Sequence, residues 1–140
     1  MANDPRVEAA LNHWAPRFVA NGIPLTDFQE VTDSIEKWED WCSAWAARGE
    51  IHEEMGRNAL SQGYNLSAGE HLTTAGVCYH FAKFLFVNDI HQMREAHMKA
   101  INCRNLALPH LKPPGERVEI PYQGKLLAGI LRKPLNVETP

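Results

Sequence analysis

The chain of 140 residues has few cysteines, no excess of basic residues and no long apolar run. Cys42, Cys78 and Cys103 are widely spaced and form no Cys-x-x-Cys pair, which argues against a disulfide scaffold or a structural zinc site. Lys and Arg number 14 against 17 Asp and Glu, and a net charge of −3 gives little attraction to nucleic-acid phosphates. No run approaches the roughly 18 apolar residues of a membrane span, and the first residues lack the apolar core of a signal peptide. Composition therefore predicts one soluble, cytoplasmic domain that binds neither nucleic acid nor membrane.

Several motifs of enzyme chemistry are also absent. Residues 52–56 (His-Glu-Glu-Met-Gly) begin like a helical zinc-protease motif, but Gly56 stands where the second histidine is required. We therefore expect a solvated helix face there and no metal site. The chain contains no Gly-x-Ser-x-Gly nucleophile motif and no Gly-rich phosphate loop. Cys78 lies in an apolar stretch, which predicts a packing role and not a nucleophile.

Apolar residues recur at spacings of three and four over most of the chain, and this predicts an all-α bundle of about five helices. Asn3 or Asp4 can cap the first helix, and Asn88 or Asp89 the fifth. Two further starts are predicted from capping boxes, in which a Ser or Thr is followed three residues later by Glu or Gln. These boxes are Thr26 with Gln29, in a shorter second helix that follows Pro24, and Ser67 with Glu70 for the fourth helix. The third helix is expected to begin near Asp33.

Three of these helices have informative faces. The third carries tryptophans on one face, and its two glycines could bend the helix or admit a neighbouring helix closely. The fourth is apolar nearly all round, which is typical of a helix in the middle of a bundle. The expected stripe of the third helix is Trp38, Trp41, Trp45, Ile51, Met55 and Ala59, with Gly49 and Gly56 beside it, and that of the fifth is Ile90, Met93, His97, Ile101 and Leu106 or Leu108.

The end of the chain changes to a β-type pattern. After Pro113-Pro114-Gly115, polar and apolar residues alternate up to Tyr122, Gln123-Gly124 supplies a turn, and a second strand follows. Because an isolated two-stranded hairpin is only marginally stable in water, we expect it to begin a sheet that continues beyond Pro140. The chain then divides into a helical domain, residues 1–112, and a linker with a first β-hairpin, residues 113–140.

The aromatic residues are mostly expected in the core, but some could form the wall of a ligand pocket between helices. Tyr64 precedes the fourth helix, and Tyr79, His80 and Lys83 lie on it. These four residues are our candidates for contact with a ligand.

Four segments in this order resemble the N-terminal helical domain and first hairpin of an α/β-hydrolase group that includes acyl-cleaving and carbon–carbon-bond hydrolases. They are Gly56–Ser61 (GRNALS), Ser67–Leu72 (SAGEHL), Ala75–Phe86 (AGVCYHFAKFLF) and Glu116–Pro134 (ERVEIPYQGKLLAGILRKP). The resemblance covers essentially the whole chain and implies that residues 1–112 are a cap over a catalytic domain, joined to it through the hairpin.

The resemblance further implies a Ser-His-Asp triad beyond Pro140, so no catalytic residue is expected in this chain and the chain alone is expected to be inactive. It implies a homodimer, no metal and no organic cofactor. The implied substrate is an aromatic pyridyl ketone of nicotine breakdown, cleaved beside the ketone to 2,6-dihydroxypyridine and 4-methylaminobutyrate. The alternative is a free-standing helical module that binds a protein or a ligand without catalysis.

Overall fold

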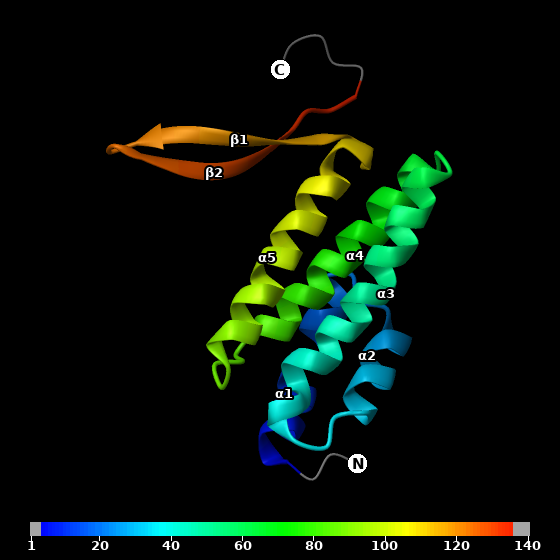
Figure 1. Cartoon of the computed structure of the whole chain (residues 1–140), viewed down its shortest axis with the longest axis vertical. Coiled ribbons are helices and arrows are strands. Elements are labelled where there is room, and N and C mark those ends of the chain that lie inside the picture. The colour runs from blue at the N-terminus through cyan, green and yellow to red at the C-terminus, as the bar shows by residue number, and fades with distance from the viewer. Residues whose placement is uncertain (1–3, 136–140) are drawn as a thin grey trace.

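The computed structural model describes residues 4–135, which form five α-helices followed by an antiparallel β-hairpin (Figure 1). This confirms the predicted fold class, an all-α bundle with a C-terminal hairpin. None of the described helices is long and apolar enough to cross a membrane. The elements are α1 (Pro5–Ala20), α2 (Leu25–Asp33), a 3₁₀ turn (Trp38–Asp40), α3 (Trp41–Ser61), α4 (Asn65–Lys83), α5 (Ile90–Ala107), a second 3₁₀ turn (Leu108–His110), β1 (Gly115–Tyr122) and β2 (Lys125–Arg132).

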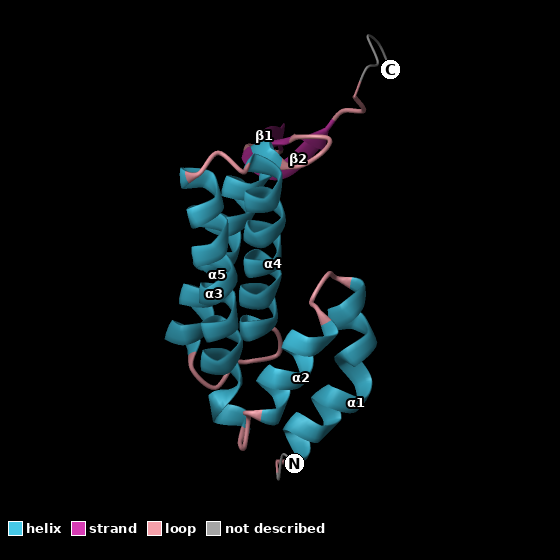
Figure 2. Ribbon diagram, turned by 90° about the vertical axis from the view of Figure 1, so that its right-hand side faces the viewer, coloured by secondary structure: helices cyan, strands magenta, loops and turns pink. Residues whose placement is uncertain are grey.

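The three longest helices lie side by side, with α4 between α3 and α5 (Figures 1 and 2). The shorter pair α1 and α2 packs beside one half of this bundle, and the hairpin lies across its other end (Figure 2). α4 is therefore covered on several sides, and eight of its residues are buried. This agrees with the sequence prediction that the fourth helix lies in the middle of the bundle.

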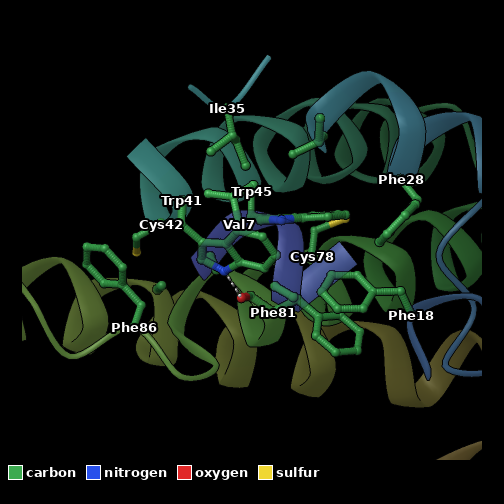
Figure 3. Packing of buried hydrophobic residues seen from close by; sticks show 14 of the residues in the cluster. Val7, Phe18, Phe28, Ile35, Trp41, Cys42, Trp45, Cys78, Phe81 and Phe86 are labelled. Carbon is green, nitrogen blue, oxygen red and sulfur yellow. Dashed lines mark hydrogen bonds between the residues drawn. The ribbon is translucent and has the colours of Figure 1, made fainter. Parts of the chain in front are cut away.

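An aromatic cluster joins α1, α3 and α4 (Figure 3). The ring of Phe18 stacks on that of Phe81, with 3.6 Å between centroids. Trp45 is fully buried against Phe18, and the indole Nε1 of Trp41 donates a hydrogen bond of 3.0 Å to the carbonyl oxygen of Phe81. Trp38 is buried too, so the tryptophan face predicted from the sequence is confirmed.

The two glycines of α3 lie where α4 approaches most closely. A Cβ atom on Gly49 would lie 2.9 Å from Cε1 of Tyr79, and one on Gly56 would lie 2.7 Å from Cγ of Leu72. Real Cβ atoms do not tolerate such distances, so any larger residue would push the helices apart. The predicted close approach at these glycines is confirmed.

The caps that rest on aspartates are confirmed. The carboxylate of Asp4 accepts a hydrogen bond from the backbone N–H of Arg6, and that of Asp89 accepts from the N–H groups of His91 and Gln92. The Arg6 side chain, together with the backbone N–H groups of Trp38 and Arg6, holds the pKa of Asp4 well below its usual range.

The start of the second helix directly after Pro24 is confirmed, but the predicted capping boxes and the predicted start of the third helix are wrong. α2 begins at Leu25, directly after Pro24, and α4 begins at Asn65, and neither has a side-chain cap. Each helix therefore starts before the Thr or Ser of its expected capping box, which leaves that side chain inside the helix. α2 continues through Asp33, so the third helix cannot begin there; it begins eight residues later at Trp41.

The apolar stripes of α3 and α5 are only partly buried. Ile51 and Met55 are exposed on α3. On α5, Ile90 and Ile101 are exposed, whereas the residues buried against α4 are mostly small: Ala96, Cys103 and Ala107. Small residues bring the two helices close together: a Cβ atom on Gly76 of α4 would lie 3.3 Å from the carbonyl oxygen of Ala100.

His52 does not lie on a solvated helix face, contrary to the sequence prediction. Its Nε2 atom is 2.6 Å from Oδ2 of Asp27 on α2, and each of these side chains is only 12% exposed. Arg48 also approaches Asp27 at 3.5 Å. The packing of α2 against α3 removes this face from solvent, and helical spacing within α3 alone gives no sign of it.

The hairpin has the turn that its sequence predicts. Gln123 and Gly124 both have positive φ, 47° and 74°, as in the two-residue turns that match strand twist. Tyr122 pairs with Lys125, and the ladder runs to Gly115 opposite Arg132. At the base of the hairpin, the Arg132 guanidinium donates hydrogen bonds of 3.0 and 2.6 Å to the carbonyl oxygen of Pro113 in the linker.

Candidate functional site

A groove of about 750 Å³ lies between α4, α5 and the inner face of the hairpin. Its apolar walls come from all three elements: Val77 on α4, Ile101 on α5 and Ile130 on β2. Asn21, directly after α1, reaches one end. This volume is large enough for a small organic ligand. We call this feature the basic groove, after its charged lining: His80, Lys83, His97, Arg104 and Arg117.

The basic residues are spread along the length of the groove. A Cβ atom on Gly76 would lie 3.7 Å from the backbone nitrogen of Arg104, which places Arg104 beside Gly76. Lys83 lies seven residues further along α4, or roughly 10 Å at the rise of an α-helix. One cation therefore lies near the hairpin end of the groove and another near the α1 end, with His80 between them.

The charges in the groove are of one sign. Its lining contains no Asp or Glu. Arg117 donates a hydrogen bond of 2.7 Å to Glu119, whereas neither Lys83 nor Arg104 has a carboxylate within salt-bridge distance among residues 4–135. Partial burial, together with the positive charges of Lys83 and Arg17, lowers the pKa of His80. The groove thus presents unneutralised positive charge beside apolar walls.

Only two of the four predicted ligand-contacting residues meet in this groove. His80 and Lys83 line it. Tyr64 is 63% exposed just before the first residue of α4, at the opposite end of the helix from Lys83. Tyr79 is fully buried and does not line the groove.

Tyr79 belongs instead to a hydrogen-bond network between α3, α4 and α5. Its hydroxyl donates a hydrogen bond of 2.9 Å to Oε2 of Glu53, and Glu53 also accepts two hydrogen bonds from Arg57. Burial and the neighbouring Glu53 carboxylate raise the pKa of Tyr79 above its usual range. The Lys99 ammonium lies 5.3 Å from the centre of the ring. These contacts join Tyr79 to α3 and α5.

Replacing Tyr79 with phenylalanine is therefore expected to lower stability by about 1 kcal/mol, since one part-buried hydrogen bond is lost. Urea unfolding followed by circular dichroism measures this loss. Ligand affinity in the basic groove should not change. A change in affinity without a change in stability would return Tyr79 to the ligand site.

Sequence reasoning missed His97, Arg104 and Arg117. The sequence pattern puts His97 in the apolar stripe of the fifth helix, and both His97 and Ile101 of that stripe line the groove. The sequence does contain a signal for Arg104, because it lies about one helical turn after Ile101 of this stripe. Arg117 could not be found because the alternation in β1 does not say which face turns toward the bundle.

The described residues near the groove include no cysteine with a lowered pKa and no group of metal-ligating side chains. Burial raises the pKa of the Cys78 thiol to about 12, in line with its predicted packing role. The Thr73 hydroxyl in the groove donates to the Gly69 carbonyl oxygen at 2.8 Å and has no adjacent base in the groove lining except the imidazoles. Among residues 4–135, no three His, Cys, Asp or Glu side chains are grouped to hold a metal ion.

Fold and site together define a helical domain that leads into a β-hairpin and shares a ligand-sized groove with it. No family model matches the chain. Over 117 residues the chain is 28% identical to 2,6-dihydropseudooxynicotine hydrolase of Paenarthrobacter nicotinovorans, an alignment that covers 84% of this chain and 31% of the relative. The crystal structure of the 2,6-dihydroxy-pseudo-oxynicotine hydrolase superposes with a TM-score of 0.76 and 26% identity, over 91% of this chain and 34% of that one.

These comparisons confirm the resemblance seen in the sequence. The chain spans about a third of the length of each protein that it matches, 31% of one and 34% of the other.

Proposed function

We propose that this chain is the substrate-enclosing cap domain of a hydrolase that acts on 2,6-dihydroxypseudooxynicotine in nicotine degradation. The likeness to the hydrolase over most of the chain supports this proposal. The observation that carries the enclosing role is the basic groove between the bundle and the hairpin, where His80 and Lys83 lie beside apolar walls.

The chemistry belongs to an α/β-hydrolase domain covalently attached beyond Pro140. A Ser-His-Asp triad there hydrolyses the carbon–carbon bond beside the ketone, and water completes the products 2,6-dihydroxypyridine and 4-methylaminobutyrate. The helical domain contributes no group to bond cleavage. It excludes water from the ring and holds the substrate in place, which lowers the entropic part of the barrier. The whole enzyme is a cytoplasmic homodimer in this proposal.

The hairpin supports an attached sheet domain over a free-standing module. Ile120, Leu127 and Leu131 lie on one face of the hairpin by its register and are 40% to 52% exposed. A two-stranded hairpin is only marginally stable in water, and this one leaves an apolar face uncovered. Further strands at the edge of the hairpin and helices over this face would remove both exposures, as in an α/β sheet.

Kinetics of the longer protein with 2,6-dihydroxypseudooxynicotine test the proposal. Replacing His80 with alanine is expected to raise KM about tenfold, the equivalent of one lost hydrogen bond to a bound ligand, with a smaller change in kcat. His91→Ala is the matched control, because that side chain is 82% exposed on α5 outside the groove.

The 140-residue chain alone should release no 2,6-dihydroxypyridine. Turnover by this chain would contradict the assignment of the chemistry to an attached domain. Unchanged kinetics in the His80 variant would contradict the enclosing role of the groove, and absence of hydrolysis by the longer protein would contradict the proposed substrate.

A further inference from the structure

We propose that the basic groove selects a planar organic anion, and that the guanidinium of Arg104 binds the acidic group of that anion. This inference rests on the proposed function, because it specifies the ionic form of the ligand that the same groove accepts. It identifies Arg104 on α5 as a residue that determines specificity, and it states which end of the groove holds the acidic group of the ligand.

The first observation is the contrast between the groove and the rest of the chain. The chain as a whole carries a net charge of −3. The groove has Lys83, Arg104 and Arg117 and two histidines, and no carboxylate among its lining residues. Positive charge is therefore concentrated at one concave surface with low-dielectric walls, where it attracts a small anion most strongly. The acidic remainder of the surface disfavours a polyanion such as nucleic acid.

The second observation distinguishes Arg104 from the other cations. Arg117 already donates to Glu119 at 2.7 Å. Arg104 has no carboxylate partner among residues 4–135. Its planar guanidinium can donate two parallel hydrogen bonds to a carboxylate, or to a ring hydroxylate and the adjacent ring nitrogen. An ammonium such as that of Lys83 provides charge without this directional match.

The third observation is the order of residues along the groove. Arg104 lies beside Gly76, where the absence of a side chain lets the backbone of α5 approach α4 closely. Val77 and Ile101 provide apolar wall along the roughly 10 Å toward Lys83. An aromatic ring fits against this wall with its acidic group at Arg104 and any side chain pointing toward His80 and Lys83. A ring that carries ionisable hydroxyl groups, such as a hydroxypyridine, belongs to this class of anion.

The test uses two ring compounds that match in size and differ in charge. Nicotinate carries a carboxylate, and nicotinamide carries a neutral amide in the same position. Titration of the 140-residue chain, followed by NMR, is expected to show at least tenfold tighter binding of nicotinate, with shifts at Val77 and Ile101. Rising salt should weaken nicotinate binding and leave nicotinamide binding unchanged, because only the charged ligand is screened.

Variants then locate the acidic group. Arg104→Gln is expected to weaken nicotinate binding about tenfold, and Lys83→Gln less than threefold. Lys125→Gln, which removes the same charge at the hairpin turn outside the groove, should change nothing. Circular dichroism of each variant checks that the fold is intact, and Arg104→Lys, which keeps the charge, should recover part of the affinity.

Several outcomes overturn the inference. Equal affinity for nicotinate and nicotinamide, or no binding of either, removes the preference for an anion. A larger loss with Lys83→Gln than with Arg104→Gln reverses the orientation. Competition by inorganic phosphate as strong as that by nicotinate removes the requirement for a ring. Hydrolysis by the longer protein is measured separately, so selective anion binding without hydrolysis contradicts only the proposed function.

Discussion

Replacing Gly56 with valine is expected to destabilise the bundle by about 3 kcal/mol, at the upper end of the usual effect of overpacking a core. The Cβ atom would lie 2.7 Å from Cγ of Leu72 and 3.2 Å from the backbone nitrogen of the same residue. The side chain of Leu72 is fully buried and the backbone of α4 is fixed by its own hydrogen bonds, so α3 and α4 must move apart. Helix propensity does not cause the loss, because valine is a better helix former than glycine.

Urea unfolding followed by circular dichroism measures this effect, with Ala47→Val as a control. Ala47 is exposed on the same helix, so the same side chain there should change stability by less than about 0.7 kcal/mol. Combining Gly56→Val with Leu72→Ala should destabilise the chain by less than the sum of the two single changes, with a coupling of about 1–3 kcal/mol. Strict additivity would show that the two residues are not in contact.

The role of these glycines illustrates which parts of the fold a sequence predicts. A glycine inside a strong helical pattern lowers helix propensity, which indicates either a bend or the close approach of another helix. The pattern cannot identify the partner, and only the fold shows that Gly49 meets Tyr79 and Gly56 meets Leu72. Helix caps are likewise only partly predictable from the sequence. Asp4 and Asp89 bind the free N–H groups of their helices, whereas the helix at Asn65 begins before Ser67 and leaves that cap unused.

Helix α5 shows why an apolar stripe need not be the buried face. Periodicity reports where large apolar residues gather, and on α5 this includes Ile101. Close packing against α4 uses Ala96, Cys103 and Ala107, because small side chains allow the two backbones to approach. Two residues of the larger stripe, His97 and Ile101, line the basic groove instead. The sequence of α5 shows a face of large apolar residues and a face of small residues. Only the contact with α4 shows which of the two is buried.

The same limit explains the partial success at the site. Tyr79 and His80 are neighbours in the sequence, and adjacent helical residues point about 100° apart at 3.6 residues per turn. Tyr79 thus lies between α3 and α5, whereas His80 lines the groove. A helix that is apolar on nearly all sides gives no sign of which face lines a pocket. The sequence therefore identifies the helix of the site but not the face of that helix.

The second large effect is expected at Trp45, where replacement by alanine should lower stability by about 3–5 kcal/mol. The indole is fully buried and lies 4.9 Å from the ring of Phe18 and 6.5 Å from that of Phe81, measured between centroids. Its removal leaves a cavity where α1, α3 and α4 meet. Trp14→Ala is the control, because Trp14 is only partly buried at the edge of the same cluster and should destabilise the chain less.

Replacement of a tryptophan by phenylalanine separates packing from hydrogen bonding in this cluster. The Nε1 atom of Trp45 is buried with no hydrogen-bond partner among residues 4–135, whereas that of Trp41 donates to the carbonyl oxygen of Phe81 at 3.0 Å. Trp45→Phe removes an unsatisfied polar group, which offsets part of the lost packing, and Trp41→Phe breaks a buried hydrogen bond. Trp41→Phe should therefore be the more destabilising by about 1 kcal/mol or more, although the atoms deleted are the same. Equal losses in urea unfolding would mean that the Trp45 indole N–H is satisfied in solution, for which a buried water is the available partner.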